Sequence, residues 1–165
     1  YFGSMRAAFI ASLLLLLAFA PKKDKHREQF VFDNENILTS EEEKQLDTLF
    51  RGHELRTTNE IVLVTTDSYD GQPDIYGYAA TFGEVIEVGK KHKNNGVVIA
   101  FSKKQGEIFI ATGVGAEKVM SDTICESYID SLMIPLLKEK MYFDGLWAGS
   151  TAVVNLLERP ENRIE

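Results

Sequence analysis

The sequence of 165 residues contains one cysteine, three histidines and four prolines. A single cysteine excludes an intrachain disulfide and a zinc site built on several thiolates. Basic residues are also scarce, because 18 Lys and Arg stand against 25 Asp and Glu, a formal net charge of -7. From residue 29 onward, 13 basic residues face 23 acidic ones (13 - 23 = -10), and so acidic a surface repels a phosphate backbone. Nucleic acid is therefore not an expected partner.

The longest apolar run lies near the N-terminus. Residues 1–4 resemble the remnant of an expression tag, and residues 5–20 have the form of a signal peptide or membrane anchor, in which Arg6 precedes an apolar stretch with a small residue, Ala18, near its end. This stretch is short for a membrane span, which takes about 20 residues. Pro21 at the candidate cleavage point and the lysines after it are instead typical of an uncleaved anchor. We expect export, either to the periplasm or anchored to a membrane and facing outside the cytoplasm.

The rest of the chain is organised as one domain. Residues 21–29 are charged and are expected to form a linker, residues 30–158 a globular domain, and residues 159–165 a C-terminal tail. A capping box starts the first helix, formed either by Ser40 with Glu43 or by Thr39 with Glu42. The apolar spacing predicts helices at residues 40–56, from Pro73 to Gly89, from Ser121 onward, and at residues 145–157. Pro135 is expected to kink or divide the third of these helices, and Asp144 to cap the fourth. Strands are predicted at residues 61–66, 97–101 and 108–112.

The order of these elements predicts the architecture. The first two strands are connected through a helix, so they are expected to be parallel with a right-handed crossover. The third strand follows the second after a short polar turn and is expected to complete a hairpin. We therefore expect an α/β fold, a three-layer α/β/α sandwich, with a small mixed sheet (a parallel pair plus a hairpin) covered by helices on both faces.

Oxygen-bearing side chains are expected at one edge of this sheet. Asn94 and Asn95 precede the second strand, and the third strand returns to the same edge, which brings Glu117 and Asp122 beside them. Carboxylate and carbonyl oxygens suit calcium or magnesium. The alternatives are a helix cap at Asp122 or Ser121 and an ordinary solvated Glu117.

Three further features bear on this edge. Gly113 and Gly115 would allow tight bends and offer backbone carbonyls. Acidic residues that follow the first strand belong to the opposite edge and are excluded as ligands (Asp67, Asp70 and Asp74). Basic residues precede the second strand and would attract a phosphate group, although a solvated basic loop is the alternative (Lys90, Lys91 and Lys93).

Several stretches resemble the TPM domain family, named after a thylakoid acid phosphatase and related proteins. They include Val31-Phe32-Asp33, Ile37 to Glu43, Ile61 to Val64, Asn95 to Ile99, and Ala111-Thr112-Gly113-Val114-Gly115-Ala116-Glu117 with Asp122. The resemblance implies the same sandwich fold and an exported or membrane-tethered domain. Some members of the family are acid phosphatases, some bind calcium or magnesium, and others are non-catalytic helpers of membrane complexes. The resemblance also places Asp33 near the metal site. The chain has Asn95 where the family often has Asp, which removes one negative charge.

Two functions follow as hypotheses. The first is a calcium- or magnesium-binding accessory module outside the cytoplasm, serving a membrane-associated complex. Its metal ligands would be Asp33, Asn95, Glu117 and Asp122, with Asn94, Gly113 and Gly115 as additional carbonyl or loop positions. The second is a metal-dependent acid phosphatase acting on phosphomonoesters. It depends on the resemblance alone, because the sequence offers no nucleophile beside an obvious base.

Overall fold

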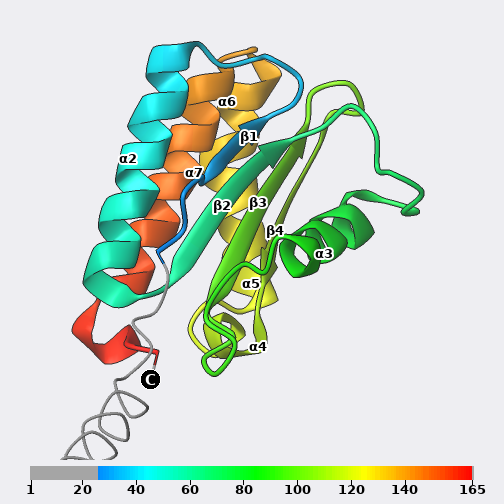
Figure 1. Ribbon diagram of the computed structural model, residues 1–165. Coiled ribbons are helices and arrows are strands. Elements are labelled where there is room, and N and C mark those ends of the chain that lie inside the picture. The colour runs from blue at the N-terminus through cyan, green and yellow to red at the C-terminus, as the bar shows by residue number, and fades with distance from the viewer. Residues whose placement is uncertain (1–25, 165) are drawn as a thin grey trace, which may run out of the picture.

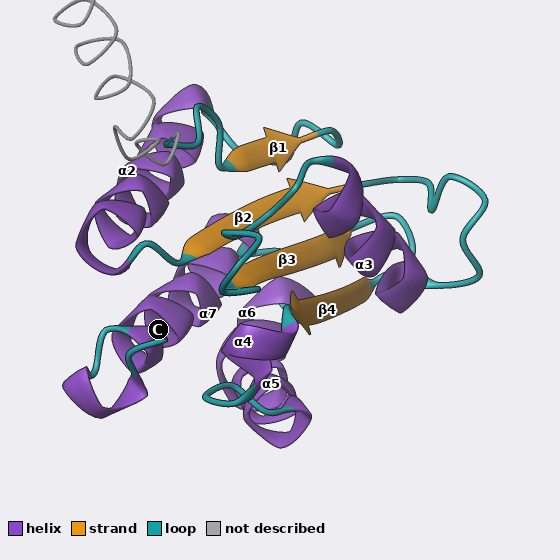
Figure 2. Ribbon diagram, turned by 60° about the horizontal axis from the view of Figure 1, so that its bottom comes forward, coloured by secondary structure: helices purple, strands orange, loops and turns teal. Residues whose placement is uncertain are grey.

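The computed structural model describes residues 26–164. These residues contain one four-stranded sheet with the strand order β1-β2-β3-β4. β1 pairs with β2 and β2 with β3 in parallel, and β4 is antiparallel to β3, so the predicted mixed sheet is confirmed (Figure 2). The strands are Val31–Asp33 (β1), Glu60–Thr65 (β2), Gly96–Ser102 (β3) and Glu107–Thr112 (β4). β1 was not predicted, because three residues are too few for a periodic pattern to be recognised.

Helices cover both faces of the sheet, as predicted (Figure 1). α3 covers one face alone, and the other helices of the sandwich pack against the opposite face. The helices are α2 (Ser40–Thr57), α3 (Ile75–Val85), α4 (Val114–Glu117), α5 (Asp122–Tyr128), α6 (Ile134–Lys138) and α7 (Tyr142–Leu157), with a π-helix η1 (Ile129–Met133) and a 3-10 helix η2 (Pro160–Asn162).

The core has two parts, one on each side of the sheet. The larger part contains Leu46 and Phe50 of α2 with Ile99 of β3, and the smaller contains Ala79 of α3 with Val98 of β3. β2 and β3 are buried along their whole length, which explains why they appear in the sequence as unbroken apolar runs.

Local signals set the helix ends, with two differences from the prediction, at α3 and α7. α2 uses the capping box of Thr39 and Glu42, the second of the two predicted registers. The Asp74 side chain accepts a hydrogen bond from the Gly77 N–H and caps α3, so Pro73 lies before the helix. α7 begins at Tyr142, which places Asp144 inside its first turn. α3 therefore begins shortly after its predicted start at Pro73, and α7 begins shortly before its predicted start at Gly145.

Pro135 divides the helix that follows Ser121, as predicted. The chain is α-helical to Tyr128, π-helical from Ile129 to Met133, and α-helical again from Ile134. Proline has no N–H to donate, and the wider π turn before it accommodates that loss.

Within residues 26–164, none of the helices is long and apolar enough to cross a membrane. The predicted signal peptide or anchor at residues 5–20 lies outside the described residues.

Candidate functional site

The two loops of the predicted site do meet at the amino ends of β2 and β3. The Asn94 carbonyl accepts hydrogen bonds from the N–H groups of Gly115 (2.9 Å) and Ala116 (3.3 Å). The Gly113 N–H donates to the Gly96 carbonyl at 2.8 Å. The direction of the strands therefore predicted correctly that these loops meet.

Gly113 and Gly115 serve close backbone packing. A Cβ on Gly115 would lie 1.9 Å from the Lys93 carbonyl oxygen, and a Cβ on Gly113 would lie 2.4 Å from that of Asn94. Both distances are far below van der Waals contact, so only glycine fits at either position. Close packing against the loop before β3 thus explains the two glycines of the Thr-Gly-x-Gly-x-Glu stretch.

Asn95 is fully buried, and its amide is used within the fold. Its Oδ1 accepts a hydrogen bond from the Lys90 N–H (2.8 Å), and its Nδ2 donates to the Thr58 carbonyl (3.1 Å) and to Asn59 Oδ1 (2.9 Å). These bonds fix the loop before β3 to the end of α2. The side chain lies in the interior and offers no open oxygen to the surface.

Asp33 lies at the opposite edge of the sheet from the other predicted ligands, which corrects its expected position. β1 runs parallel to β2, so Asp33 ends beside Thr65, at the carboxyl edge. Its Oδ1 accepts a hydrogen bond from the Thr65 hydroxyl (2.5 Å), and its Oδ2 accepts one from the Leu38 N–H (2.8 Å). The carboxylate thereby holds the turn between β1 and α2.

Glu117 and Asp122 are exposed and line one surface hollow of about 620 Å³ together with Glu84 and Glu87. Asp122 is the first residue of α5, and Ser121 before it is the N-cap residue, with no side-chain capping bond. In residues 26–164 no three His, Cys, Asp or Glu side chains come together as a metal-binding group. Calcium takes six to eight oxygen ligands, so the predicted set of Asp33, Asn95, Glu117 and Asp122 does not fit the ion as one site.

The three predicted phosphate-attracting lysines have separate roles. Lys90 is buried, and its Nζ contacts carboxylate oxygens of Glu54 (2.9 Å) and Glu60 (2.8 Å), which corrects the expectation that it faces a phosphate. Lys91 is exposed and pairs with Glu87 at 3.0 Å. Lys93 donates to the Ile164 carbonyl at 3.2 Å. The lysines therefore do not converge on one anion.

A buried ionic cluster surrounds Lys90. Burial raises the pKa of Glu60, but hydrogen bonds from Lys90, Gly89 and Arg27 outweigh it, so the net pKa is lowered. Burial lowers the pKa of Lys90, but its bonds to Glu60 and Glu54 outweigh this effect and raise it. Lys90 thus compensates the charge of two buried carboxylates, a role for which no sequence pattern is a signal.

The model of the TPM domain matches residues 31–156 of the chain. The chain belongs to the TPM domain family. Among curated proteins, none matches it.

Solved structures support the fold of this TPM domain. The N-terminal domain of a protein from P. gingivalis is 25% identical, with a TM-score of 0.68, and the match covers 78% of this chain and 81% of that one. The BA42 protein of the psychrophilic bacterium Bizionia argentinensis is 21% identical, with a TM-score of 0.65, covering 80% and 92%. The N-terminal domain of the cg2496 protein of Corynebacterium glutamicum is 13% identical, with a TM-score of 0.62, covering 82% and 84%. The last two show a common fold alone.

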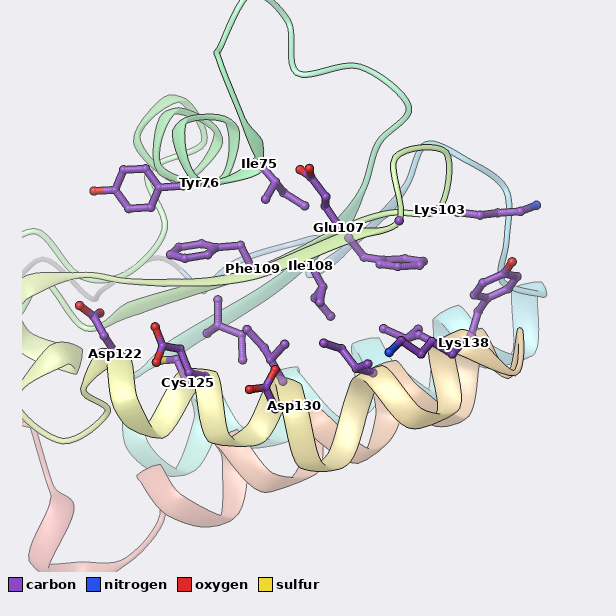
Figure 3. Close-up of a pocket in the computed structure, with 18 residues that line it drawn as sticks. Ile75, Tyr76, Lys103, Glu107, Ile108, Phe109, Asp122, Cys125, Asp130 and Lys138 are labelled. Carbon is purple, nitrogen blue, oxygen red and sulfur yellow. The ribbon is translucent and has the colours of Figure 1, made fainter.

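The TPM domain also has a groove that sequence reasoning missed. It has a volume of about 740 Å³ and lies beside β4, between Tyr76 of α3 and the helices from α5 to α6 (Figure 3). Its lining is largely apolar and includes Ile108, Phe109 and Ile129. The sequence predicted β4 as a strand, but it could not identify the helices that face it.

We expect the stability of this TPM domain to depend on pH through His53 of α2. Burial lowers the pKa of His53 below its usual 6.5, although its Nδ1 lies 3.0 Å from Glu158 Oε1. The unfolded chain therefore binds a proton more readily between pH 6.5 and the lower folded pKa, so stability falls as the pH drops through this range. We expect His53→Asn to reduce that slope in urea-unfolding curves measured from pH 7 to pH 5. His92→Asn, in an exposed loop, is the matched control, and an unchanged slope in His53→Asn would contradict the assignment.

Proposed function

We propose that this TPM domain is a non-catalytic accessory module that binds another protein, in a membrane-associated complex outside the cytoplasm. The observation that carries the proposal is the groove of about 740 Å³ beside β4, which combines an apolar lining with the open edge of the sheet. Apolar concave surfaces with a polar rim are typical of binding sites. The location follows from the signal-like sequence of residues 5–20.

The acid phosphatase alternative has less support. A phosphomonoester carries two negative charges, and the lysines nearest the predicted site are committed to Glu54, Glu60, Glu87 and a backbone carbonyl. Catalysis of phosphoryl transfer depends on positive charge aimed at the transferring group.

A turnover assay separates these two functions. We expect the full chain to hydrolyse p-nitrophenyl phosphate no faster than the buffer blank at pH 5 to 7, with calcium or magnesium present. The double variant Glu117→Gln/Asp122→Asn is the control. If the natural sequence hydrolysed the phosphate ester steadily and this variant did not, the chain would be an enzyme.

A divalent cation is a second ligand to consider, at the hollow that Glu117 and Asp122 share with Glu84 and Glu87. Several exposed carboxylates around one hollow favour calcium or magnesium, and a site with few protein ligands retains water on the ion. We expect weak binding, with a Kd on the order of 1 mM.

NMR titration with calcium and then magnesium tests this cation site. Amide shifts are expected at residues 113–122 and at the end of α3, and they are expected to vanish in Glu117→Gln/Asp122→Asn. Asp33 and Asn95 should not move, because their oxygens are bonded within the fold. Saturating shifts centred on Asp33 would show instead that the ion binds at the opposite edge.

A further inference from the structure

β4 is an edge strand, and half of its backbone groups point away from the sheet. The Gly113 N–H donates to the Gly96 carbonyl, and these two residues lie opposite each other, next to the pair of Val97 and Thr112. Gly113 is therefore at a hydrogen-bonded position of the ladder. In an antiparallel pair, hydrogen-bonded and non-hydrogen-bonded positions alternate. Phe109 therefore bonds to β3, whereas Ile108 directs its N–H and C=O outward.

The outward groups are not equally accessible. Ile110 also points its backbone outward, but it is only 2% exposed. Ile108 is half-buried and Glu107 is exposed. A chain that pairs with β4 can therefore do so at Ile108, near the start of the strand, without moving other parts of the domain.

An apolar cavity opens beside this end of β4. Ile108 of β4, shown in Figure 3, lines it together with Phe101 of β3 and Tyr142 of α7. Ile134 and Leu137 line it from α6. Burying one Phe or Leu side chain here would remove apolar surface from water and so favour binding. The cavity is thus positioned to take a side chain of a strand that pairs with Ile108.

The charges around the groove indicate what kind of chain fits. Four carboxylates line it and only two lysines, so the rim carries an excess of negative charge; the residues are Glu107, Asp122, Glu126, Asp130, Lys103 and Lys138. A basic partner complements this rim. A second copy of this chain does not, because residues 29–165 carry 13 basic against 23 acidic groups and repel each other.

We propose that this groove binds an extended, basic segment of another protein by strand addition at Ile108, with one large apolar side chain of the segment in the cavity. Main-chain hydrogen bonds give such contacts their affinity, and pockets for alternate side chains give specificity. This proposal rests on the proposed function, binding of another protein, and names its site and the chemistry of the partner.

A fluorescent peptide tests the proposal with the full chain. The probe has nine residues, a central phenylalanine flanked by alternating valine and lysine. Two isomers carry N-methyl groups, one on the even-numbered amides and the other on the odd-numbered amides. Only one edge of an added strand faces β4, so we expect one isomer to lose affinity about tenfold and the other to bind like the parent peptide. Equal binding of both isomers, or no binding of the parent peptide, would overturn strand addition.

Charge reversal tests the rim. Glu126→Lys/Asp130→Lys is expected to weaken parent-peptide binding roughly tenfold. Glu161→Lys, on the exposed η2 turn, is the control and should leave the affinity unchanged. Loss of affinity that is equal in the control would show only a general charge effect and overturn the site. Concentration-dependent broadening of the Ile108 amide without peptide would identify a second copy as the occupant and overturn it too.

The two proposals can fail separately. Phosphatase turnover would overturn the non-catalytic function whatever the peptide does. Absent peptide binding together with absent turnover would overturn only this groove as the docking site.

Discussion

Gly115→Ala is expected to destabilise the domain by about 3 kcal/mol. The added Cβ would lie 1.9 Å from the Lys93 carbonyl oxygen, which belongs to the backbone and has no rotamer to change. The loop before β3 would have to move, and with it the bonds from Gly115 and Ala116 to the Asn94 carbonyl. Urea unfolding followed by circular dichroism measures the loss.

Gly52→Ala is the matched control for this variant. Gly52 lies inside α2, and its added Cβ would meet only the flexible end of Arg56, at 3.0 Å. Alanine favours a helix over glycine by up to about 1 kcal/mol, so this variant should be neutral or more stable. Equal stability of Gly115→Ala and the natural sequence would mean that the two loops do not pack as described.

Lys90→Met is expected to cost about 4 kcal/mol of stability. Methionine keeps the length of the side chain but removes the charge between Glu54 and Glu60, which lie 2.9 and 2.8 Å from Nζ. Glu54 is 1% exposed, so its carboxylate would remain in the interior without its principal counter-charge. Removing one partner of a buried ion pair is more costly than the pair itself is stabilising.

Lys91→Met provides the comparison for this variant. Lys91 is next in the chain, but its side chain is 85% exposed and its pair with Glu87 lies in solvent. A surface pair of this kind contributes less than about 1 kcal/mol. If Lys90→Met and Lys91→Met lost the same small amount, Lys90 would belong to a solvated basic loop, the other interpretation that the sequence allowed.

Much of the fold could be predicted from the sequence because its signals are local. Continuous β-branched runs identified β2 and β3, and a helical connection between them required a parallel pair. The hairpin of β3 and β4 followed from a short polar turn, and the division at Pro135 followed from its missing N–H. β1 lacked such a signal because it has three residues and its pairing is with distant residues of β2.

The candidate site was predictable only in part. Strand direction correctly brought Asn94 beside Gly113 and Gly115. It could not check the position of Asp33, which the resemblance alone had placed near this site, because β1 was not recognised as a strand. It also could not show that Asn95 and Lys90 are buried, since an amide or lysine near a loop looks the same in sequence whether its partners are water or other side chains. The groove beside β4 depends on tertiary packing alone.

Hydrogen exchange at the amides of β4 tests the central claim, that the open edge at Ile108 is the binding surface. In the free chain we predict fast exchange at Ile108 and slow exchange at its neighbour Phe109, whose N–H is bonded to β3. The alternating valine and lysine peptide, added at ten times its Kd, should slow exchange at Ile108 about tenfold and leave Phe109 unchanged. Slow exchange at Ile108 in the free chain, or no change with bound peptide, would contradict the account.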